Sequence, residues 1–225
     1  MTALVLQARL DSSRLPQKAL LPLAGRPLVL RVMEAFKDFD CDAKVLACPE
    51  DSAASFAPLA EEAGFSLITG PKDDVLERYC LVIRKLGADM IIRATGDNPL
   101  VFADAAAALD REAGELNADY AGYSGLPLGA GVECVSSEAL LRAGREARLP
   151  SEREHVCPYL YNHPEIFTLH RPLAPLKWQG PGCRITVDTR DDYEKVRLLY
   201  DELLSLPFEK RVLGEHIIAI IKRRA

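Results

Sequence analysis

The sequence lacks the short cysteine and histidine motifs that hold structural metals or redox disulfides. Its six cysteines include no C-x-x-C pair, and its four histidines are not spaced as zinc ligands are. No apolar run approaches the ~20 residues that cross a membrane, and the first residues have neither the basic region nor the cleavage site of a signal peptide. We therefore expect a cytoplasmic protein whose cysteines are free and buried, although an even number of cysteines also permits disulfides.

Two common nucleotide-binding patterns are also missing. Neither the Walker pattern G-x-x-x-x-G-K-[ST] nor the dinucleotide pattern G-x-G-x-x-G occurs, which counts against a P-loop and against a dinucleotide cofactor. The net charge of −5 argues against a nucleic-acid backbone as the main partner. A chain of 225 residues with 48% hydrophobic and 27% charged residues is globular, and it is long enough to bury a core without a metal.

Short β-type runs alternate with helical patterns through the first half of the chain. Strands are expected at residues 3–6, 43–48, 65–68 and 90–93. Helices are expected at residues 27–37, 52–63, 74–86 and 103–113, where apolar residues recur at three- and four-residue spacing. This alternation predicts βαβ crossovers, and therefore an α/β fold with a mostly parallel sheet.

The second half of the chain has a less regular pattern. Strands are expected at residues 118–120, 132–135, 166–170 and 184–187, and helices at residues 137–148, 151–162 and 191–205. Three prolines and two glycines between residues 172 and 182 predict a loop. Without repeats or an obvious linker, we expect a single domain over residues 1–225, from which an excursion at about residues 122–182 covers the site or contacts a partner.

A cationic loop follows the first expected strand. Residues 7–20 carry Arg9, Arg14 and Lys18 against one anion, Asp11. The loop begins at the carboxyl end of a strand, where open α/β sheets bind their ligands. Arginine can hold phosphate oxygens in pairs and lysine supplies a mobile point charge, so we interpret the loop as a polyphosphate site. The alternative is a solvated basic loop without a ligand.

Two aspartates directly follow expected strands in different parts of the chain. Asp97 and Asp188 would therefore meet at the carboxyl edge of the sheet, where carboxylates and substrate phosphates together suit Mg²⁺. Each also has a structural alternative. Asp97 precedes an Asn-Pro pair and could form a turn, and Asp188 precedes Thr189 and Asp192, which have the spacing of a helix capping box.

Five blocks, in order along nearly the whole chain, resemble bacterial cytidylyltransferases. The blocks are Q-A-R-L-D-S-S-R-L-P-Q-K with the L-P-L-A-G-R-P-L that follows, and residues 69–79, 93–100, 151–156 and 186–189. The enzymes they resemble make CMP-activated acidic sugars, and the group includes spore-coat-polysaccharide (SpsF-like) relatives. The resemblance implies a nucleotidyltransferase fold, with a doubly wound, mostly parallel mixed sheet and CTP at its carboxyl edge.

The resemblance also implies a reaction and assigns roles to residues. The reaction is Mg²⁺-dependent transfer of CMP from CTP to an acidic sugar or a phosphorylated or phosphonate acceptor, with release of pyrophosphate, in cell-surface glycan synthesis. Catalysis is assigned to Arg9, Arg14 and Lys18, and metal binding to Asp97 and Asp188. Nucleotide binding is assigned to Gln7, Ala8, Arg9, Ser12, Ser13, Gly70, Asp73, Asp74 and Gly96. Acceptor binding is assigned to Glu133, Glu152, Arg153 and His155, of which His155 could also be a general base.

Some of these residues have structural alternatives. Asp73 and Asp74 stand where they could cap a helix, and Ser151-x-x-Glu154 has the spacing of a capping box. Gln17 departs from the family pattern, which has glycine there, so the backbone is expected to approach the phosphates less closely.

Two rival functions and an assembly state also follow from the resemblance. A glycosyltransferase that uses a nucleotide sugar is one rival, and a non-catalytic nucleotide-binding subunit is the other. Related enzymes are commonly dimers, so we expect a homodimer. The apolar turn at residues 126–129 and the side chains of Val156, Tyr159 and Leu160 are expected to form its contact, although these residues could instead pack into their own subunit's core.

Overall fold

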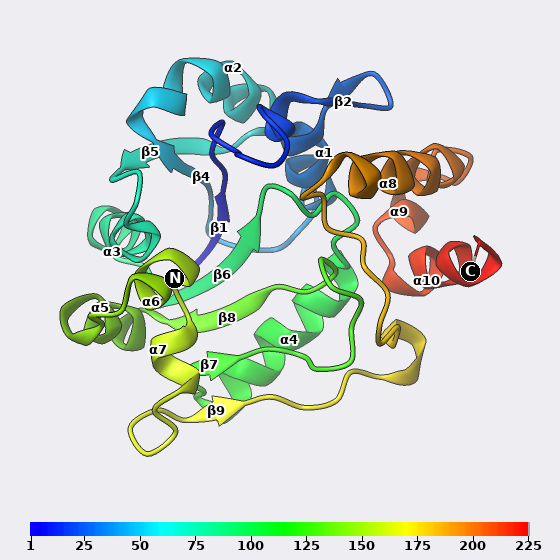
Figure 1. The fold of residues 1–225 in the computed structure, drawn as a ribbon. Coiled ribbons are helices and arrows are strands. Elements are labelled where there is room, and N and C mark those ends of the chain that lie inside the picture. Colours follow the sequence, from blue (N-terminus) through cyan, green and yellow to red (C-terminus); the bar gives the residue numbers. More distant parts are fainter. Residues whose placement is uncertain (225) are drawn as a thin grey trace.

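A seven-stranded mixed sheet runs through the protein (Figure 1). The computed structural model describes residues 1–224. The strands are β1 (Thr2–Gln7), β4 (Ala43–Pro49), β5 (Ser66–Gly70), β6 (Met90–Thr95), β7 (Tyr120–Ala121), β8 (Glu133–Ser136) and β9 (Leu169–His170). Their order is β5-β4-β1-β6-β8-β7-β9, and β8 runs antiparallel to both of its neighbours while the other pairs are parallel. The expected fold class is confirmed.

Helices cover both faces of the sheet (Figure 1). One face packs against α1 (Leu28–Ala35), α2 (Ala53–Ala63), α4 (Ala103–Leu116), α8 (Arg190–Leu203) and α10 (Gly214–Arg224). The other face packs against α3 (Val75–Leu86), α5 (Ser137–Glu146) and α7 (Pro158–Tyr161), and α6 (Pro150–His155) packs against α3 and α7. Successive side chains of β1 alternate between these two cores, so Leu4 and Leu6 join the first and Ala3 and Val5 the second. A strand buried on both faces reads as a continuous apolar run.

The elements expected in the first half are confirmed to within a few residues, but the second half differs in two places. Residues 151–162 form two short helices rather than one, because Val156 has a φ of 74° and Pro158 begins α7. Residues 184–187 do not form a strand, and a single bridge links Arg184 to Leu128. Neither the β2 (Pro22–Leu23) and β3 (Arg26–Pro27) hairpin, the short helix α9 (Phe208–Arg211), nor α10 was predicted.

The part of the expected dimer contact that was assigned to residues 156–160 is wrong. Val156 and Leu160 are fully buried and Tyr159 is nearly so, because all three pack into the core of their own subunit. The most exposed large apolar side chains of this half lie on the loop after β9, where Leu173 and Leu176 are 65% and 83% exposed, and Leu128 and Leu149 are exposed as well. All six cysteines are free thiols, and within residues 1–224 no helix has the length and apolar character of a membrane span.

Candidate active site

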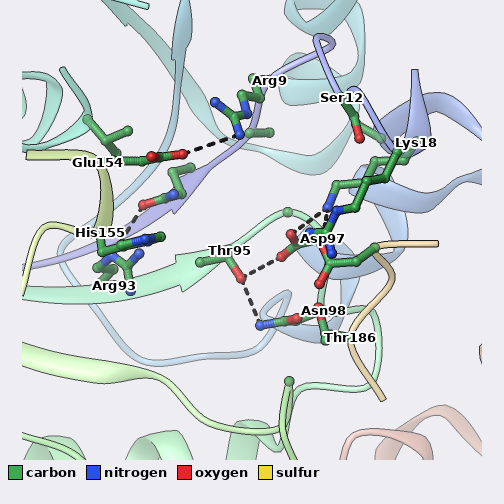
Figure 2. A pocket seen from close by; sticks show the side chains of 18 of the residues that line it. Arg9, Ser12, Lys18, Arg93, Thr95, Asp97, Asn98, Glu154, His155 and Thr186 are labelled. Atoms are coloured by element: carbon green, nitrogen blue, oxygen red, sulfur yellow. Dashed lines mark hydrogen bonds and ion pairs between the residues drawn. The ribbon is translucent and has the colours of Figure 1, made fainter. Parts of the chain in front are cut away.

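A cavity of about 520 Å³ lies at the carboxyl ends of β1 and β6. Figure 2 shows its polar side chains converging from several separate parts of the chain. The expected site residues that line it are Gln7, Ala8, Arg9, Ser12, Ser13, Arg14, Lys18, Gly96, Asp97, His155 and Asp188. The other expected residues lie outside this lining: Gly70, Asp73, Asp74, Glu133, Glu152 and Arg153.

The two expected metal aspartates meet at a single cation, which is the side chain of Lys18. Its Nζ donates to Asp97 Oδ2 at 2.8 Å and to Asp188 Oδ1 at 2.9 Å. The same ammonium group donates to the carbonyl oxygen of Val187 at 2.9 Å. Residues 79 and 170 positions away from Lys18 are thus brought to one point.

Backbone contacts hold the two aspartate loops together. The Val187 N–H donates to the carbonyl of Asp97 at 2.9 Å, which joins the loops although residues 184–187 are not a strand. The Gly96 N–H donates to the carbonyl of Gln7 at 2.8 Å. A Cβ at Gly96 would lie 2.9 Å from the Ala8 Cβ. A glycine is therefore required where the loop after β6 crosses the end of β1.

Neighbouring side chains fix one oxygen of each aspartate. The Thr95 hydroxyl donates to Asp97 Oδ1 at 2.8 Å, and the Asn98 amide donates in turn to the Thr95 oxygen at 2.7 Å. The guanidinium of Arg184 binds Asp188 Oδ2. The remaining oxygen of each carboxylate is the one that contacts Lys18.

Asp188 lies among three cations. Arg14 and Lys18 both approach its Oδ1, at 3.1 and 2.9 Å, and Arg184 holds its Oδ2. Burial raises the pKa of the Asp188 carboxyl, but these cations outweigh that effect and hold its pKa below the ordinary value. Asp188 is therefore ionised at neutral pH, which is the state that a metal ligand requires.

The oxygen donors at this point suit a magnesium ion. Two carboxylates and one backbone carbonyl surround the Lys18 ammonium, which stands in for a cation among hard oxygen ligands. Within residues 1–224, no cluster of three or more acidic, histidine or cysteine side chains is arranged to hold a metal. The pair Asp97 and Asp188 nevertheless matches the way Mg²⁺ is usually bound, by one or two carboxylates with waters and substrate phosphates completing its coordination.

The loop that carries Lys18 contains an unusual backbone conformation. Gln17 has φ 53° and ψ 29°, in the left-handed region that favours glycine. It precedes the single turn Lys18–Leu20, in which the Leu20 N–H donates to the Gln17 carbonyl at 2.8 Å. Gln17, at the position where the resemblance implied a glycine, thus adopts a glycine-like conformation.

Four residues expected to bind the nucleotide or the acceptor lie outside the first cavity and make structural contacts. Asp74 caps α3 by accepting from the Glu77 N–H at 2.9 Å, and it pairs with Arg153 at 2.6 Å, which ties α6 to α3. Glu152 is buried, and its carboxylate accepts from the Leu149 N–H at the start of α6. Gly70 packs under Arg78, where a Cβ would lie 2.8 Å from the arginine Cγ. Their assignment to ligand binding stays a prediction, whereas the expected Ser151 cap is wrong, because α6 begins at Pro150 and its N-cap is Leu149.

Two other expected residues lie away from the first cavity. Asp73 is exposed just before α3. The Glu133 carboxylate binds Arg93, its cross-strand partner on β6, and accepts from the Tyr120 hydroxyl at 2.8 Å. Glu133 does line a second cavity, described below.

Two arginines in the lining, Arg78 and the mostly covered Arg93, were missed by the sequence analysis. Arg78 is 2% exposed, burial lowers the pKa of its guanidinium, and its Nε has no hydrogen-bond partner. Arg93 donates from Nε to Gln7 Oε1 at 3.2 Å. A guanidinium only donates, so the atom of the Gln7 amide that faces Arg93 is its oxygen. The available signal was a cation within an otherwise apolar helix face or strand.

A second cavity of about 320 Å³ adjoins the first. The two share Arg93, Thr95, Asn98, Leu128 and Gly129. The rest of its lining comes from residues 120–133 and from Arg171, whose guanidinium lies 5.3 Å from the centre of the Tyr161 ring. The backbone at Gly129 has φ 99° and passes so close to Thr186 that a Cβ would lie 2.6 Å from its nitrogen.

Comparison with known sequences identifies relatives over almost the whole chain. The profile of the family described as "Cytidylyltransferase" matches residues 3–212. The chain is 31% identical to the spore coat polysaccharide biosynthesis protein SpsF of Bacillus subtilis (strain 168), over 97% of this chain and 93% of that protein. It is 30% identical to the 3-deoxy-manno-octulosonate cytidylyltransferase of Anaeromyxobacter dehalogenans (strain 2CP-1), over 88% of this chain and 96% of that enzyme.

Solved structures share the fold. A cytidylyltransferase from Leptospira borgpetersenii superposes with a TM-score of 0.89 at 24% identity, over 99% of this chain and 94% of that one. CMP:2-keto-3-deoxy-manno-octonic acid synthetase complexed with CTP superposes with a TM-score of 0.70 at 18% identity, over 89% and 98%. Fold and family together define an enzyme of the nucleotidyltransferase class. Within that class, the chain belongs to the cytidylyltransferase family.

Proposed function

We propose that this enzyme transfers CMP from CTP to a small anionic acceptor and releases pyrophosphate. The observation that supports this most directly is the convergence of Lys18, Asp97 and Asp188 beside the arginines of the first loop. Cations suit a triphosphate, and two carboxylates suit the metal that accompanies it. A relative at 30% identity is named for cytidylyl transfer.

The first cavity is proposed to hold CTP, with its triphosphate along residues 7–18. Arg9 and Arg14 are partly exposed at the cavity, with side chains 48% and 63% accessible, and can close on phosphate oxygens. Arg9 contacts Glu154 of α6 at 3.6 Å, a weak exposed pair that a phosphate can replace. Lys18 would neutralise charge on the departing pyrophosphate.

Asp97 and Asp188 are proposed to hold Mg²⁺. When bound there, Mg²⁺ would supply charge neutralisation to the triphosphate as an acceptor oxygen attacks the α-phosphorus. The protein's own contribution is to position the reactants, since Thr95 and Arg184 fix the two carboxylates.

The second cavity is proposed to hold the acceptor, an acidic sugar or a phosphorylated or phosphonate compound. Residues 122–182, the expected excursion, supply much of its lining, and we propose that this segment binds the acceptor. Arg93 is already neutralised by Glu133, whereas Arg171 is exposed and lies over an aromatic ring. Arg171 is therefore the cation proposed to bind the acceptor's anion. His155, which lines the first cavity, is proposed to accept the proton of the acceptor hydroxyl.

Isothermal titration with CTP, UTP, ATP and GTP tests the nucleotide assignment. We expect CTP to bind most tightly, and preference for a purine nucleotide would refute the cytidylyl proposal while leaving the fold intact. For the acceptor, Arg171→Ala should raise the acceptor KM without changing CTP affinity. Lys177→Ala, which removes a nearby cation outside both cavities, is the matched control. An unchanged KM in Arg171→Ala would remove Arg171 from the acceptor site.

A further inference from the structure

Within residues 1–224, the Lys18 ammonium is the only cation that contacts both Asp97 and Asp188. Thr95 holds Asp97 Oδ1 and Arg184 holds Asp188 Oδ2. The other two oxygens, Asp97 Oδ2 and Asp188 Oδ1, both contact Lys18 Nζ, at 2.8 and 2.9 Å. The Lys18 side chain is 14% exposed, so it is enclosed at this point rather than solvated (Figure 2).

A divalent cation bridging the two aspartates would use the same pair of oxygens. An ammonium group and a metal ion cannot both lie between them, because each needs direct contact and their charges repel. Mg²⁺ also gives up its water reluctantly, so it competes poorly with a cation already in place. Binding of the metal therefore requires Lys18 to leave.

We propose that Lys18 closes the metal site in the nucleotide-free enzyme, and that the triphosphate opens it by drawing the ammonium onto its own oxygens. This inference rests on the proposed function, since it assumes that a triphosphate enters the first cavity. Metal and nucleotide then bind cooperatively, and each raises the affinity for the other by the same factor. Free metal would not occupy the site between turnovers.

The geometry of the loop allows this exchange. The backbone of Lys18 is held by its N–H bond to the Leu15 carbonyl at 3.2 Å, while the long side chain can rotate. Arg14 offers a contrast within the same site. It approaches Asp188 alone, at 3.1 Å, and its side chain is 63% exposed, so it does not bridge the two carboxylates.

Mn²⁺ binding without nucleotide tests the proposal, with electron paramagnetic resonance reporting free Mn²⁺. Lys18→Met removes the bridging cation and keeps an unbranched side chain that is only one heavy atom shorter. It should bind Mn²⁺ at least about 10-fold more tightly than the wild type, within the usual range of coupled binding. Arg14→Met removes one cation beside Asp188 but no bridge, so its Mn²⁺ affinity should change by less than about 3-fold.

Thermal unfolding provides a second readout. Without metal, Lys18→Met should unfold at a lower temperature than the wild type, because two carboxylates lose a shared partner. Saturating Mn²⁺ should restore that temperature in the variant and leave the wild type almost unchanged. Lys18→Gln gives the same comparison if the Met variant does not fold.

The outcomes separate this inference from the proposed function. If wild type and Lys18→Met bind Mn²⁺ equally well without nucleotide, Lys18 does not close the site, although CMP transfer could still occur. If Lys18→Met and Arg14→Met gain the same Mn²⁺ affinity, the gain is a general effect of removing a positive charge, and the proposal is overturned. If no variant binds Mn²⁺ even with CTP present, both the closure and the metal role in the proposed function are wrong.

Discussion

Asp192 stabilises the loop that presents Asp188, and its replacement gives a quantitative test of the site's construction. Its carboxylate accepts from the backbone N–H groups of Asp188 and Thr189 at 3.1 and 3.0 Å. The Thr189 hydroxyl accepts from the Asp192 N–H, which completes a capping box at the start of α8. Arg184, which also holds Asp188, donates to Asp192 from Nε at 2.9 Å.

The expected loss in the free energy of unfolding follows from the pKa of the Asp192 carboxyl. Burial raises this pKa, but the Arg184 guanidinium and the backbone donors outweigh burial and lower it from 3.8 to about 2. A difference of this size corresponds to roughly 2.5 kcal/mol of stability in the limit. Solvent screening at the 37% exposed Arg184 reduces this to about 1–2 kcal/mol. Because the folded pKa is depressed, the contribution is complete above about pH 4 and is lost as pH falls toward 2.

The assay is urea unfolding of wild type and Asp192→Asn at pH 7, 4 and 3. Asn keeps the shape of the side chain and one capping oxygen, so the charge is the main loss. We expect the variant to be less stable by about 1–2 kcal/mol at pH 7, with the difference shrinking below pH 4. Asp201→Asn, an exposed position on the same helix, should change stability by less than about 0.5 kcal/mol. A difference that is absent at pH 7, or constant down to pH 3, would refute this reasoning.

Three further predictions follow from the site and the surface. Asp97→Asn or Asp188→Asn should lower turnover at least ~100-fold, and near-normal turnover at saturating Mg²⁺ would contradict the metal assignment. Gln17→Gly should raise the free energy of unfolding by about 0.5–1 kcal/mol, because glycine adopts positive φ without strain; lower stability in urea would show that Gln17 is not strained. Sedimentation equilibrium should show a dimer that Leu176→Glu dissociates, and a wild-type monomer would exclude the dimer.

The sheet and the position of the cationic loop at residues 7–20 could be predicted from the sequence, because both depend on the pattern of apolar and charged residues along the chain. Central strands buried on both faces, such as residues 3–6, are continuous apolar runs that few other structures produce. A cationic segment directly after such a strand has to lie at the carboxyl edge. Asp188 was placed correctly from a strand that does not exist, since the bond from Val187 to Asp97 brings it there instead.

The acceptor side could not be predicted from the sequence in the same way. Glu152 and Arg153 have residue types that suit both ligand binding and helix ends, and in the structure Glu152 accepts from the Leu149 N–H at the start of α6 while Arg153 pairs with the α3 cap Asp74. Arg78 and Arg93 were missed for the opposite reason. A buried cation is recognised by its surroundings, and the tertiary contacts that provide them are formed by segments distant in the sequence.

Pyrophosphate release tests the central claim most directly. The enzyme is mixed with CTP, Mg²⁺ and each member of a panel of sugar acids, sugar phosphates and phosphonates, and the products are identified by mass spectrometry. We predict pyrophosphate in equal amount to a CMP-linked product with at least one acceptor, and neither product with Asp97→Asn. A parallel reaction replaces CTP with a nucleotide sugar. If that reaction releases a nucleotide while CTP yields no pyrophosphate with any acceptor, the account is contradicted and a glycosyltransferase is favoured.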